Sequence, residues 1–346
     1  MEVASLRFSP GSEGLLTPLM PWLSDAQVSE ILINQPGEAY IERLGQMTRV
    51  ELPALSAIHL KRLFLFIANE NHQELNEQSP MLSGNLYDGS RVQLVCPPAT
   101  KHYTLSIRRP SIKRMTLDDY KNTPFYEAVK PFERHQSMSD YLSEEEALLK
   151  RLYHDQNWPE FIERAVGLKK NIVISGETSS GKTTFLNACT HHIPKTERII
   201  TLEDTYEIQA HHPNKVAMLA PKRLEGQGSG LSMQDLVQCA LRLRPDRIIM
   251  GEIRGREILD FVSACSTGHE GSITSIHASN PRVAFMRMIQ MYKLNNVPSM
   301  RDEDIEGILN EVIDIILQVK KTAMGRQLQY VYYKNAPMPL KDIRHE

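Results

Sequence analysis

The sequence predicts an α/β protein with two domains, in which a mostly parallel sheet follows a smaller α+β domain. Three observations lead to this fold class. From residue 166 onward, short apolar strands alternate with helical stretches, which is typical of parallel sheets. Residues 1–115 mix strand and helix patterns. A glycine-rich segment lies between a predicted strand and a predicted helix near the start of the second region, 166–346.

The first region contains recognisable signals for both helices and strands. Ser24–Gln27 resembles a capping box that opens a short helix. A strand is expected over 38–42, after a Pro-Gly turn signal, and an apolar stripe predicts a helix over 57–69. Two alternating segments, 91–96 and 103–108, could pair as antiparallel strands.

Residues 116–165 lack strand signals and are predicted to form a helical linker, with a helix that starts after Ser143. Beyond it, the strands of the parallel sheet are expected over 171–175, 198–202, 247–250 and 272–276. A helix should begin at Pro281, and the apolar residues Ile305, Ile308, Leu309 and Val312 mark another.

Composition excludes several classes of protein. The net charge of −2 and pI near 6.6 argue against a strongly basic surface that coats nucleic acid. No apolar run approaches the roughly 18–20 residues that span a bilayer, so no integral membrane segment is expected, and the N-terminus lacks a signal-peptide pattern. The four cysteines form no C-x-x-C pair, which favours reduced core thiols in a cytoplasmic protein without structural zinc.

The glycine-rich segment matches the P-loop pattern G-x-x-x-x-G-K-[ST] at every position. A P-loop between a strand and a helix cradles phosphate groups with backbone N–H groups. Lys182 would reach the outer phosphates, and the Thr183 hydroxyl would be a ligand of Mg²⁺. The alternative, a chance match, is disfavoured by the flanking strand and helix. The residues are Gly176, Glu177, Thr178, Ser179, Ser180, Gly181, Lys182 and Thr183.

Carboxylates end two of the predicted strands. Glu252 follows 247–250, and Glu203 and Asp204 follow 198–202. Because parallel strands present their carboxyl ends at one edge of the sheet, these acids should lie beside the phosphate loop. Glu252 could hold the Mg²⁺ shell or orient the attacking water, and Glu203 could act with it. The structural alternative is that these acids only cap a turn or helix.

One histidine and several arginines are further candidates. His277 ends the last predicted strand, where it could sense the terminal phosphate or be purely structural. Guanidinium groups match phosphate oxygens, although a single arginine more often lies on a solvated face. The candidates are Arg108, Arg109, Arg242, Arg244 and Arg254.

Taken in order, four blocks resemble the secretion traffic ATPase superfamily. GETSSGKTT (Gly176–Thr184) resembles its Walker A loop and RIITLEDTYEI its Asp box, while LRLRPDRIIMGEIRG and GHEGSITSIHAS resemble its Walker B block and His box. The chain looks most like the VirB-type ATPases of type IV secretion and conjugation systems, which SIRRPS at 106–111 also resembles. The tetracysteine module of type II secretion ATPases and the C-terminal motif of pilus retraction ATPases are absent from the sequence.

The resemblance implies a RecA-like ATPase domain over 166–346, a smaller N-terminal domain and a hexameric ring. ATP would lie between the two domains of one subunit and the edge of the next. The phosphate loop up to Thr184, with Lys182 and Thr183, would bind phosphate and Mg²⁺; Glu203 and Glu252 would polarise water; and His277 would sense the phosphate. Arg108, with Arg91 as second candidate, would reach the nucleotide from the N-terminal domain. The motifs leave open whether Arg109 shares this role and whether Arg108 acts in cis or in trans.

The resemblance thus implies a cytoplasmic Mg²⁺-dependent ATPase motor, peripherally associated with an inner-membrane secretion complex. It would power type IV secretion by substrate translocation, pilus assembly or both. Its partners would be further copies of the chain, inner-membrane channel components, and a secreted protein or nucleoprotein. Three alternatives remain: a nucleic-acid translocase or helicase-like motor, a type II secretion or pilus ATPase, and an ATP-gated scaffold. The long linker also allows domains to be swapped between subunits.

Overall fold

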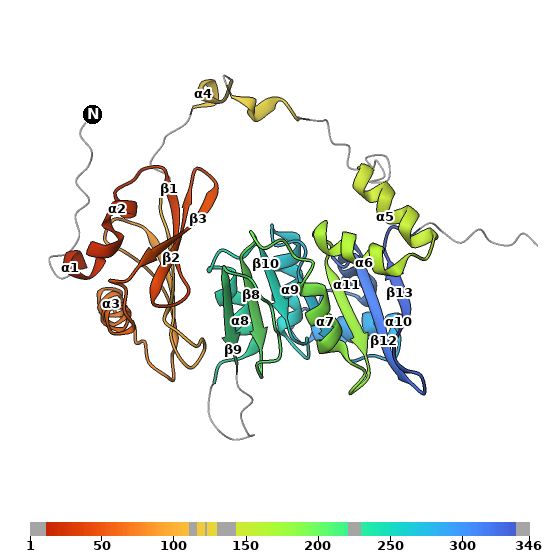
Figure 1. The fold of residues 1–346 in the computed structure, drawn as a ribbon. Coiled ribbons are helices and arrows are strands. Elements are labelled where there is room, and N and C mark those ends of the chain that lie inside the picture. The colour runs from red at the N-terminus through yellow and green to blue at the C-terminus, as the bar shows by residue number, and fades with distance from the viewer. Residues whose placement is uncertain (1–11, 111–115, 122, 130–142, 221–229, 337–346) are drawn as a thin grey trace, which may run out of the picture.

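The computed structural model describes residues 12–110, 116–121, 123–129, 143–220 and 230–336. Two sheets organise these residues: a six-stranded antiparallel sheet in the N-terminal part and a seven-stranded, mostly parallel sheet in the C-terminal part (Figure 1). No helix within the described ranges is long and apolar enough to cross a membrane.

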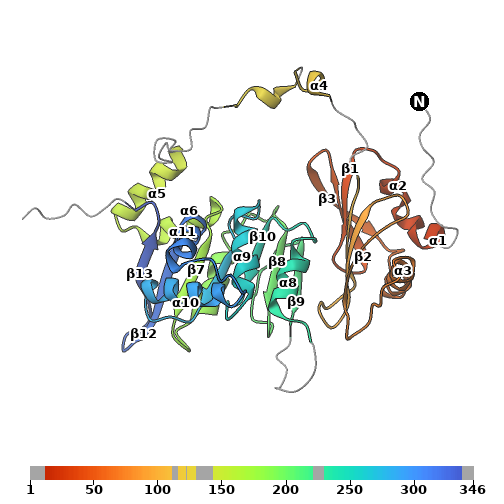
Figure 2. The ribbon, with the colours of Figure 1, turned by 180° about the vertical axis from the view of Figure 1, so that it is seen from behind.

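The N-terminal domain is one antiparallel sheet with helices packed on it (Figure 2). The strand order is β3-β2-β1-β6-β5-β4. Helix α3 buries an apolar stripe that includes Leu60 and Phe64 against the sheet, and the Ser56 hydroxyl caps its first turn by accepting from the His59 amide at 3.2 Å. The elements are α1 (Ser12–Leu16), η1 (Thr17–Leu19), α2 (Met20–Leu23), β1 (Val28–Ile33), β2 (Gly37–Arg43), β3 (Gln46–Leu52), α3 (Ala57–Glu70), β4 (Met81–Asn85), β5 (Arg91–Val95) and β6 (Thr104–Arg108).

The prediction that a helix begins at Ser24–Gln27 is wrong. Helix α2 ends at Leu23, and β1 begins at Val28. The Asp25 carboxylate accepts from the Gln27 amide at 2.9 Å, which forms a turn in place of a helix cap. The expected antiparallel pairing of the two later segments is confirmed, because β5 pairs with β6.

The C-terminal domain is built on a sheet of order β13-β12-β7-β11-β10-β8-β9, in which only the β12–β13 pairing is antiparallel. Two short elements, α4 (Leu117–Lys121) and η2 (Pro124–Tyr126), lie between the domains in the chain. The C-terminal elements are α5 (Glu144–His154), α6 (Trp158–Gly167), β7 (Ile172–Gly176), α7 (Lys182–Thr190), β8 (Ile199–Glu203), β9 (Lys215–Leu219), α8 (Met233–Ala240), β10 (Arg247–Met250), α9 (Glu257–Ser266), β11 (Ile273–Ile276), α10 (Pro281–Lys293), α11 (Asp302–Val312), β12 (Ile315–Thr322) and β13 (Gly325–Tyr333).

Helices cover both faces of this sheet. One apolar cluster joins α5, α6 and α7 to one face, through residues such as Leu149, Phe161 and Leu186. A larger cluster joins α8, α9, α10 and α11 to the other face. Because α5 and α6 pack directly on the sheet, we propose that the second domain begins at α5, within the segment expected to be a linker.

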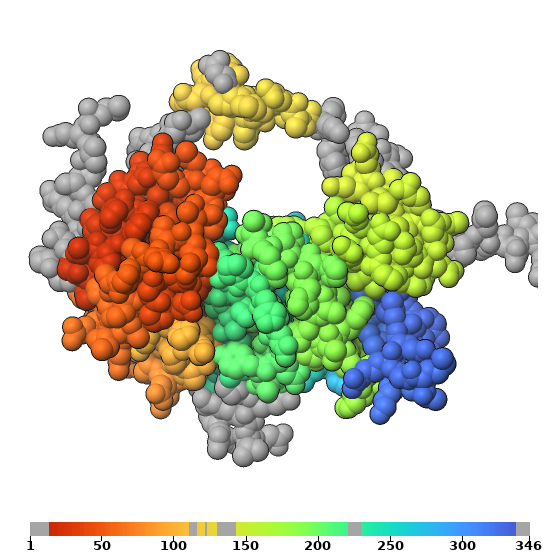
Figure 3. All heavy atoms as spheres, in the orientation of Figure 1, coloured from red at the N-terminus to blue at the C-terminus, as the bar shows by residue number. Residues whose placement is uncertain are grey.

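The N-terminal domain packs against the β9 edge of the parallel sheet, where Figure 3 shows the two in direct contact. The Leu219 amide donates to the Ala99 carbonyl at 2.8 Å, and the Tyr40 hydroxyl donates to the Pro213 carbonyl at 2.7 Å. Helix α5 lies near the opposite edge, where the Tyr153 hydroxyl donates to the β13 carbonyl of Val331 at 3.0 Å. The chain therefore crosses the full width of the sheet between the two domains.

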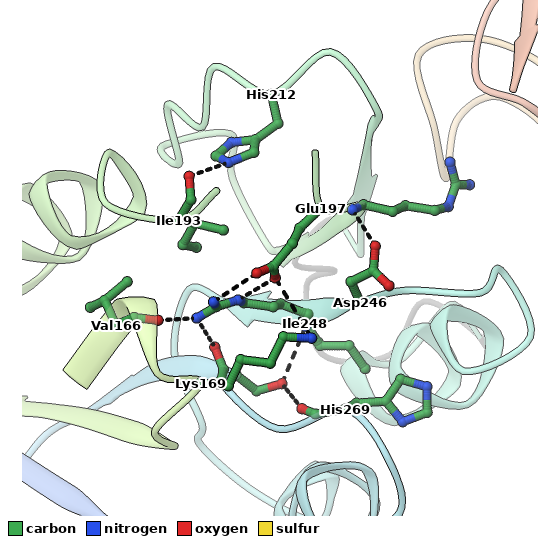
Figure 4. Close-up of polar contacts among 12 residues, drawn as sticks. Val166, Lys169, Ile193, Glu197, His212, Asp246, Ile248 and His269 are labelled. Atoms are coloured by element: carbon green, nitrogen blue, oxygen red, sulfur yellow. Dashed lines mark hydrogen bonds and ion pairs between the residues drawn. The ribbon is translucent and has the colours of Figure 1, made fainter. Parts of the chain in front are cut away.

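Two buried arginines hold the amino ends of the parallel strands, one through an ion pair and one through hydrogen bonds (Figure 4). The Arg247 guanidinium is fully buried and donates to both Glu197 carboxylate oxygens, at 2.6 and 3.0 Å, and to the Val166 carbonyl at 2.6 Å. Arg198, also fully buried, donates to the Leu243 carbonyl at 2.8 Å and to the Asn34 side chain at 2.7 Å. Burial lowers the pKa of Arg198 to about 9.

Candidate functional site

The phosphate loop connects β7 to α7 at the carboxyl edge of the parallel sheet. A side chain at Gly176 would place a Cβ 2.6 Å from the Val319 carbonyl of β12, so only glycine fits. Gly181 has φ +97° immediately before α7. Ser180 is buried, whereas Glu177 to Ser179 and Thr184 are exposed. The loop thus has the close packing and left-handed backbone that its glycines predict.

Lys182 occupies the centre of the loop. Its buried ammonium donates to the Gly176 and Glu177 carbonyls, at 3.0 and 3.1 Å, and lies 3.5 Å from His277 Nε2. Burial lowers the pKa of Lys182, and the negative charge of Glu252 partly opposes this shift. An ammonium group held by neutral partners can transfer to phosphate oxygens when they arrive.

Glu252 connects this lysine to an ionic cluster. One of its carboxylate oxygens lies 3.2 Å from His277 Nε2, and the other accepts from the Arg254 guanidinium at 2.6 and 2.9 Å. Arg254 also contacts Asp204. Burial lowers the pKa of His277, and Glu252 opposes the shift. The structure therefore brings Lys182, Glu252 and His277 together, as the sequence predicts.

Glu203 lies at the end of β8 and is 3 % exposed. One carboxylate oxygen accepts from the Glu207 and Ile208 amides, at 2.7 and 2.6 Å, which is the turn-capping role considered as an alternative. The other oxygen has no hydrogen-bond partner among the described residues. Burial raises the pKa of Glu203, so this carboxylate is prepared to take up a proton.

A cavity of about 530 Å³ opens beside these groups. Its lining carries many carboxylates, so bound phosphate would need a cation beside it. Sequence reasoning missed Glu257, which accepts from the Arg254 and Gly255 amides at 2.6 and 2.8 Å; its position in the first turn of α9 was the available signal. The polar lining residues are Thr183, Glu203, Asp204, Thr205, Glu207, Glu252, Arg254 and Glu257.

The N-terminal-domain arginines lie elsewhere in this chain. Arg91 and Arg108 are directly opposite each other on β5 and β6, and Arg108 lies 3.6 Å from the Glu30 carboxylate. Both line a second cavity, of about 510 Å³, with Arg242 and Arg244. The latter two precede β10, so this cavity is at the amino edge of the parallel strands, opposite the phosphate loop. Within one chain these arginines do not line the phosphate cavity.

Arg109 faces neither cavity. It is buried, and its guanidinium donates to the Trp22 and Val28 carbonyls, each at 3.4 Å, and to the Asp25 carbonyl. Burial lowers its pKa. In this chain Arg109 therefore fastens the end of β6 to the segment that follows α2.

Comparison with known proteins gives a consistent result. Residues 143–327 match the model of the family described as "Type II/IV secretion system protein". The VirB11 protein of the Brucella suis type IV secretion system is 36% identical over 92% of this chain and 89% of its own length. PtlH of Bordetella pertussis, also a type IV secretion system protein, is 32% identical over 94% of this chain and 96% of its own. This chain belongs to the type II/IV secretion system protein family.

A solved member of the family has the same fold. The crystal structure of the Brucella suis VirB11 ATPase, in complex with sulphate, aligns with a TM-score of 0.85 at 34% identity, over 93% of this chain and 97% of that one. The expected RecA-like ATPase domain with a smaller α+β N-terminal domain is confirmed. The expected resemblance to type IV secretion ATPases, and with it the class of ATP hydrolase, is confirmed as well.

Proposed function

We propose that this protein is a Mg²⁺-dependent ATPase motor that works as a ring of identical subunits, six by family resemblance, and powers type IV secretion. The observation that carries the proposal is the group formed by Lys182, Glu252 and His277 beside the phosphate loop. Lys182 would bind the outer phosphates, Glu252 and Glu203 would polarise the attacking water, and His277 would sense the terminal phosphate.

The residues beside the phosphate loop fit Mg²⁺. The Thr183 side chain lines the cavity, and the free oxygen of Glu203 is a buried acceptor there. Hydroxyl and carboxylate oxygens, directly or through water, are the donors that Mg²⁺ prefers when it also binds substrate phosphates. When bound, the ion would neutralise the charge that develops on the phosphates. Thr183 would hold it, and Glu203 or Glu252 would orient its water shell.

The positions of the arginines support the proposed ring. Arg91, Arg108 and Arg242 face a cavity at the edge opposite the phosphate loop. If they serve a nucleotide, it would be one bound by another copy of the chain, so we propose that they act in trans. Each subunit would then present a phosphate loop at one edge and an arginine surface at the other. Copies joined head to tail in this way close into a ring when the rotation allows.

We propose that such a ring performs work on a secretion channel. ATP hydrolysis would change the angle between the two domains of each subunit. Inner-membrane channel components would couple that change to pilus assembly or to transport of a protein or nucleoprotein. We place the ring in the cytoplasm, on the inner face of the secretion complex. The support is the similarity to type IV secretion proteins over more than nine-tenths of the chain.

The test is steady-state ATP hydrolysis with Mg²⁺ as a function of protein concentration, with molar mass followed by light scattering. Activity per subunit should rise as a six-fold species appears, and chelation of Mg²⁺ should remove it. Equal activity per subunit in a monomer would contradict the shared site. Strong stimulation by single-stranded DNA, with affinity that falls steeply in salt, would favour the nucleic-acid translocase instead.

A further inference from the structure

The β12–β13 hairpin extends past the end of β7 at the phosphate-loop edge. Strand β12 runs parallel to β7, with Val319 opposite Gly176, the last residue of β7. It continues to Thr322, and β13 returns from Gly325. The tip of the hairpin is therefore beside the loop that would cradle phosphate.

Two basic residues face the same side of this tip. Lys321 and Arg326 are directly opposite each other in the antiparallel register, so their side chains share one face. Leu317 and Val319 lie on the same face of β12 as Lys321, because residues two apart in a strand point to the same side. Both pack in the apolar cluster that contains Leu186 of α7. Beyond the sheet, the basic pair thus continues the face that α7 and the phosphate loop cover.

Arg326 lies directly against the phosphate loop. A Cβ added at Gly181 would be 2.6 Å from Arg326 Cδ and 3.1 Å from its Nε. Gly181 immediately precedes Lys182, so the guanidinium lies next to the first residue of α7. Its five N–H donors are suited to phosphate oxygens.

Within the described ranges, neither Lys321 nor Arg326 forms an ion pair with a carboxylate, and both side chains are exposed. Like charges directly opposite each other destabilise a hairpin. A bound anion would reverse this cost, because it would be attracted to both cations.

The strand order of the sheet indicates which phosphate groups of the nucleotide would lie beside the basic pair. Strands β11, β10 and β8, which end near His277, Glu252 and Glu203, all lie on one side of β7, whereas β12 lies on the other. The terminal phosphate belongs beside the acids that polarise water. We infer that Lys321 and Arg326 bind the α- and β-phosphates from the opposite side and so clamp the nucleotide in cis. This inference rests on the proposed ATP site.

The experiment compares the full-length wild type with the double variant Lys321→Ala/Arg326→Ala. We expect the Kd for ADP and the KM for ATP to rise about tenfold, as for one lost charge-assisted contact, with kcat at saturating ATP close to wild type. Lys320→Ala is the matched control, because Lys320 is exposed on the same hairpin but faces the other side. It should change neither constant. Arg326→Lys should recover only part of the affinity, since it keeps the charge without the fork.

Four results would overturn the inference. Unchanged Kd and KM in the double variant would remove the contact, and a fall in kcat with unchanged KM would move the pair to the terminal phosphate. A loss for ADP but not GDP would show recognition of the base, because a phosphate clamp must weaken both nucleotides equally. If the wild type bound no ADP, the proposed ATP site and the clamp would both fail; normal binding in all variants would end the clamp alone.

Discussion

The two edges of the parallel sheet are constructed differently. At the carboxyl edge, His277 contacts both Lys182 and Glu252 within a single chain. At the amino edge, buried Arg247 is paired with Glu197, but the more exposed Arg91 and Arg108 face an open cavity with one carboxylate, Glu30, near them. One edge forms a connected polar group in itself, whereas the other presents the exposed Arg108 to an open cavity, beside Arg244, which is paired with Glu42 and Asp246.

This difference separates the residues that should matter in any subunit from those that should matter only in an assembly. Groups at the carboxyl edge should affect nucleotide chemistry wherever the chain is folded. Groups on the arginine surface, which comprises Arg91, Arg108, Arg242 and Arg244, should affect it only when copies meet.

The largest expected effect is that of Lys182→Ala. Lys182 is proposed to bind the outer phosphates, so its loss should reduce ATP turnover by at least about 1,000-fold, measured by phosphate release. The control is Lys195→Ala, because Lys195 donates to the His211 carbonyl and does not line the cavity beside the phosphate loop. Substantial turnover in the Lys182 variant would mean that the carboxyl edge is not the active site.

Glu252→Gln should leave nucleotide binding intact and reduce kcat by about 100-fold, because the amide cannot polarise water. Nucleotide binding and turnover are measured on the same sample. The neighbouring cavity acid Glu257, whose role is to hold backbone amides, offers a contrast: Glu257→Gln keeps acceptor capacity and should retain more activity. A Glu252 variant that cycles at the wild-type rate would contradict the proposed role.

At the amino edge, Glu197→Gln should destabilise the fold by about 4 kcal/mol, because it leaves the Arg247 cation buried without its partner charge. Denaturant unfolding measures this loss. Glu163→Gln, at an exposed ion pair with His192, is the control and should change stability by less than about 1 kcal/mol. Equal effects would show that burial does not distinguish the two pairs.

Glu30 gives the amino edge a pH dependence. Burial raises the pKa of this carboxyl from 4.5 to about 7, so the folded state favours its neutral form. The contribution of neutral Glu30 to the free energy of unfolding is fully present below pH 4.5 and is lost as the pH rises through 7. Glu30→Gln should therefore become more stable relative to wild type by up to about 3 kcal/mol between pH 4.5 and 8. Glu51→Gln, at a carboxylate whose side chain is 80% exposed, is the control for the substitution itself.

The smallest expected effect is that of Arg108→Ala, and it tests whether Arg108 acts on the nucleotide of its own subunit or on that of a neighbouring one. Arg108→Ala should reduce turnover about tenfold, since Arg91 remains beside it. Mixing it with the inactive Lys182→Ala chain should restore part of the activity, because intact phosphate loops then meet intact arginine surfaces. No gain on mixing, with assembly confirmed by light scattering, would place Arg108 in cis or outside the site.

Much of this organisation was predictable from local sequence signals. The strand that ends at Met250 was placed to the residue, and β7, β8 and β11 to within one residue, because short buried runs before the loop and acids are strong signals. The proximity of Lys182, Glu252 and His277 followed from parallel strands sharing one edge.

Features that depend on tertiary contacts were not predictable. Strand β9 is half exposed and has little local pattern, and the β12–β13 hairpin was missed although it contacts the phosphate loop. The capping pattern at Ser24 predicted a helix, but the segment forms a turn in which the Asp25 side chain accepts from the Gln27 amide. Arg109 is held by backbone carbonyls, whereas Arg108 lines the second cavity. No local sequence signal distinguishes these two neighbouring arginines.

The contact between Ala99 and β9 has a practical consequence for how this protein is handled. An uncovered edge strand is a template for pairing with other chains and a common origin of aggregation. The N-terminal domain shields part of that edge, with the Leu219 amide bonded to the Ala99 carbonyl and Met218 bridged to Thr100. A fragment that begins at α5 would lose this cover, so we expect it to be poorly soluble even with its phosphate loop intact.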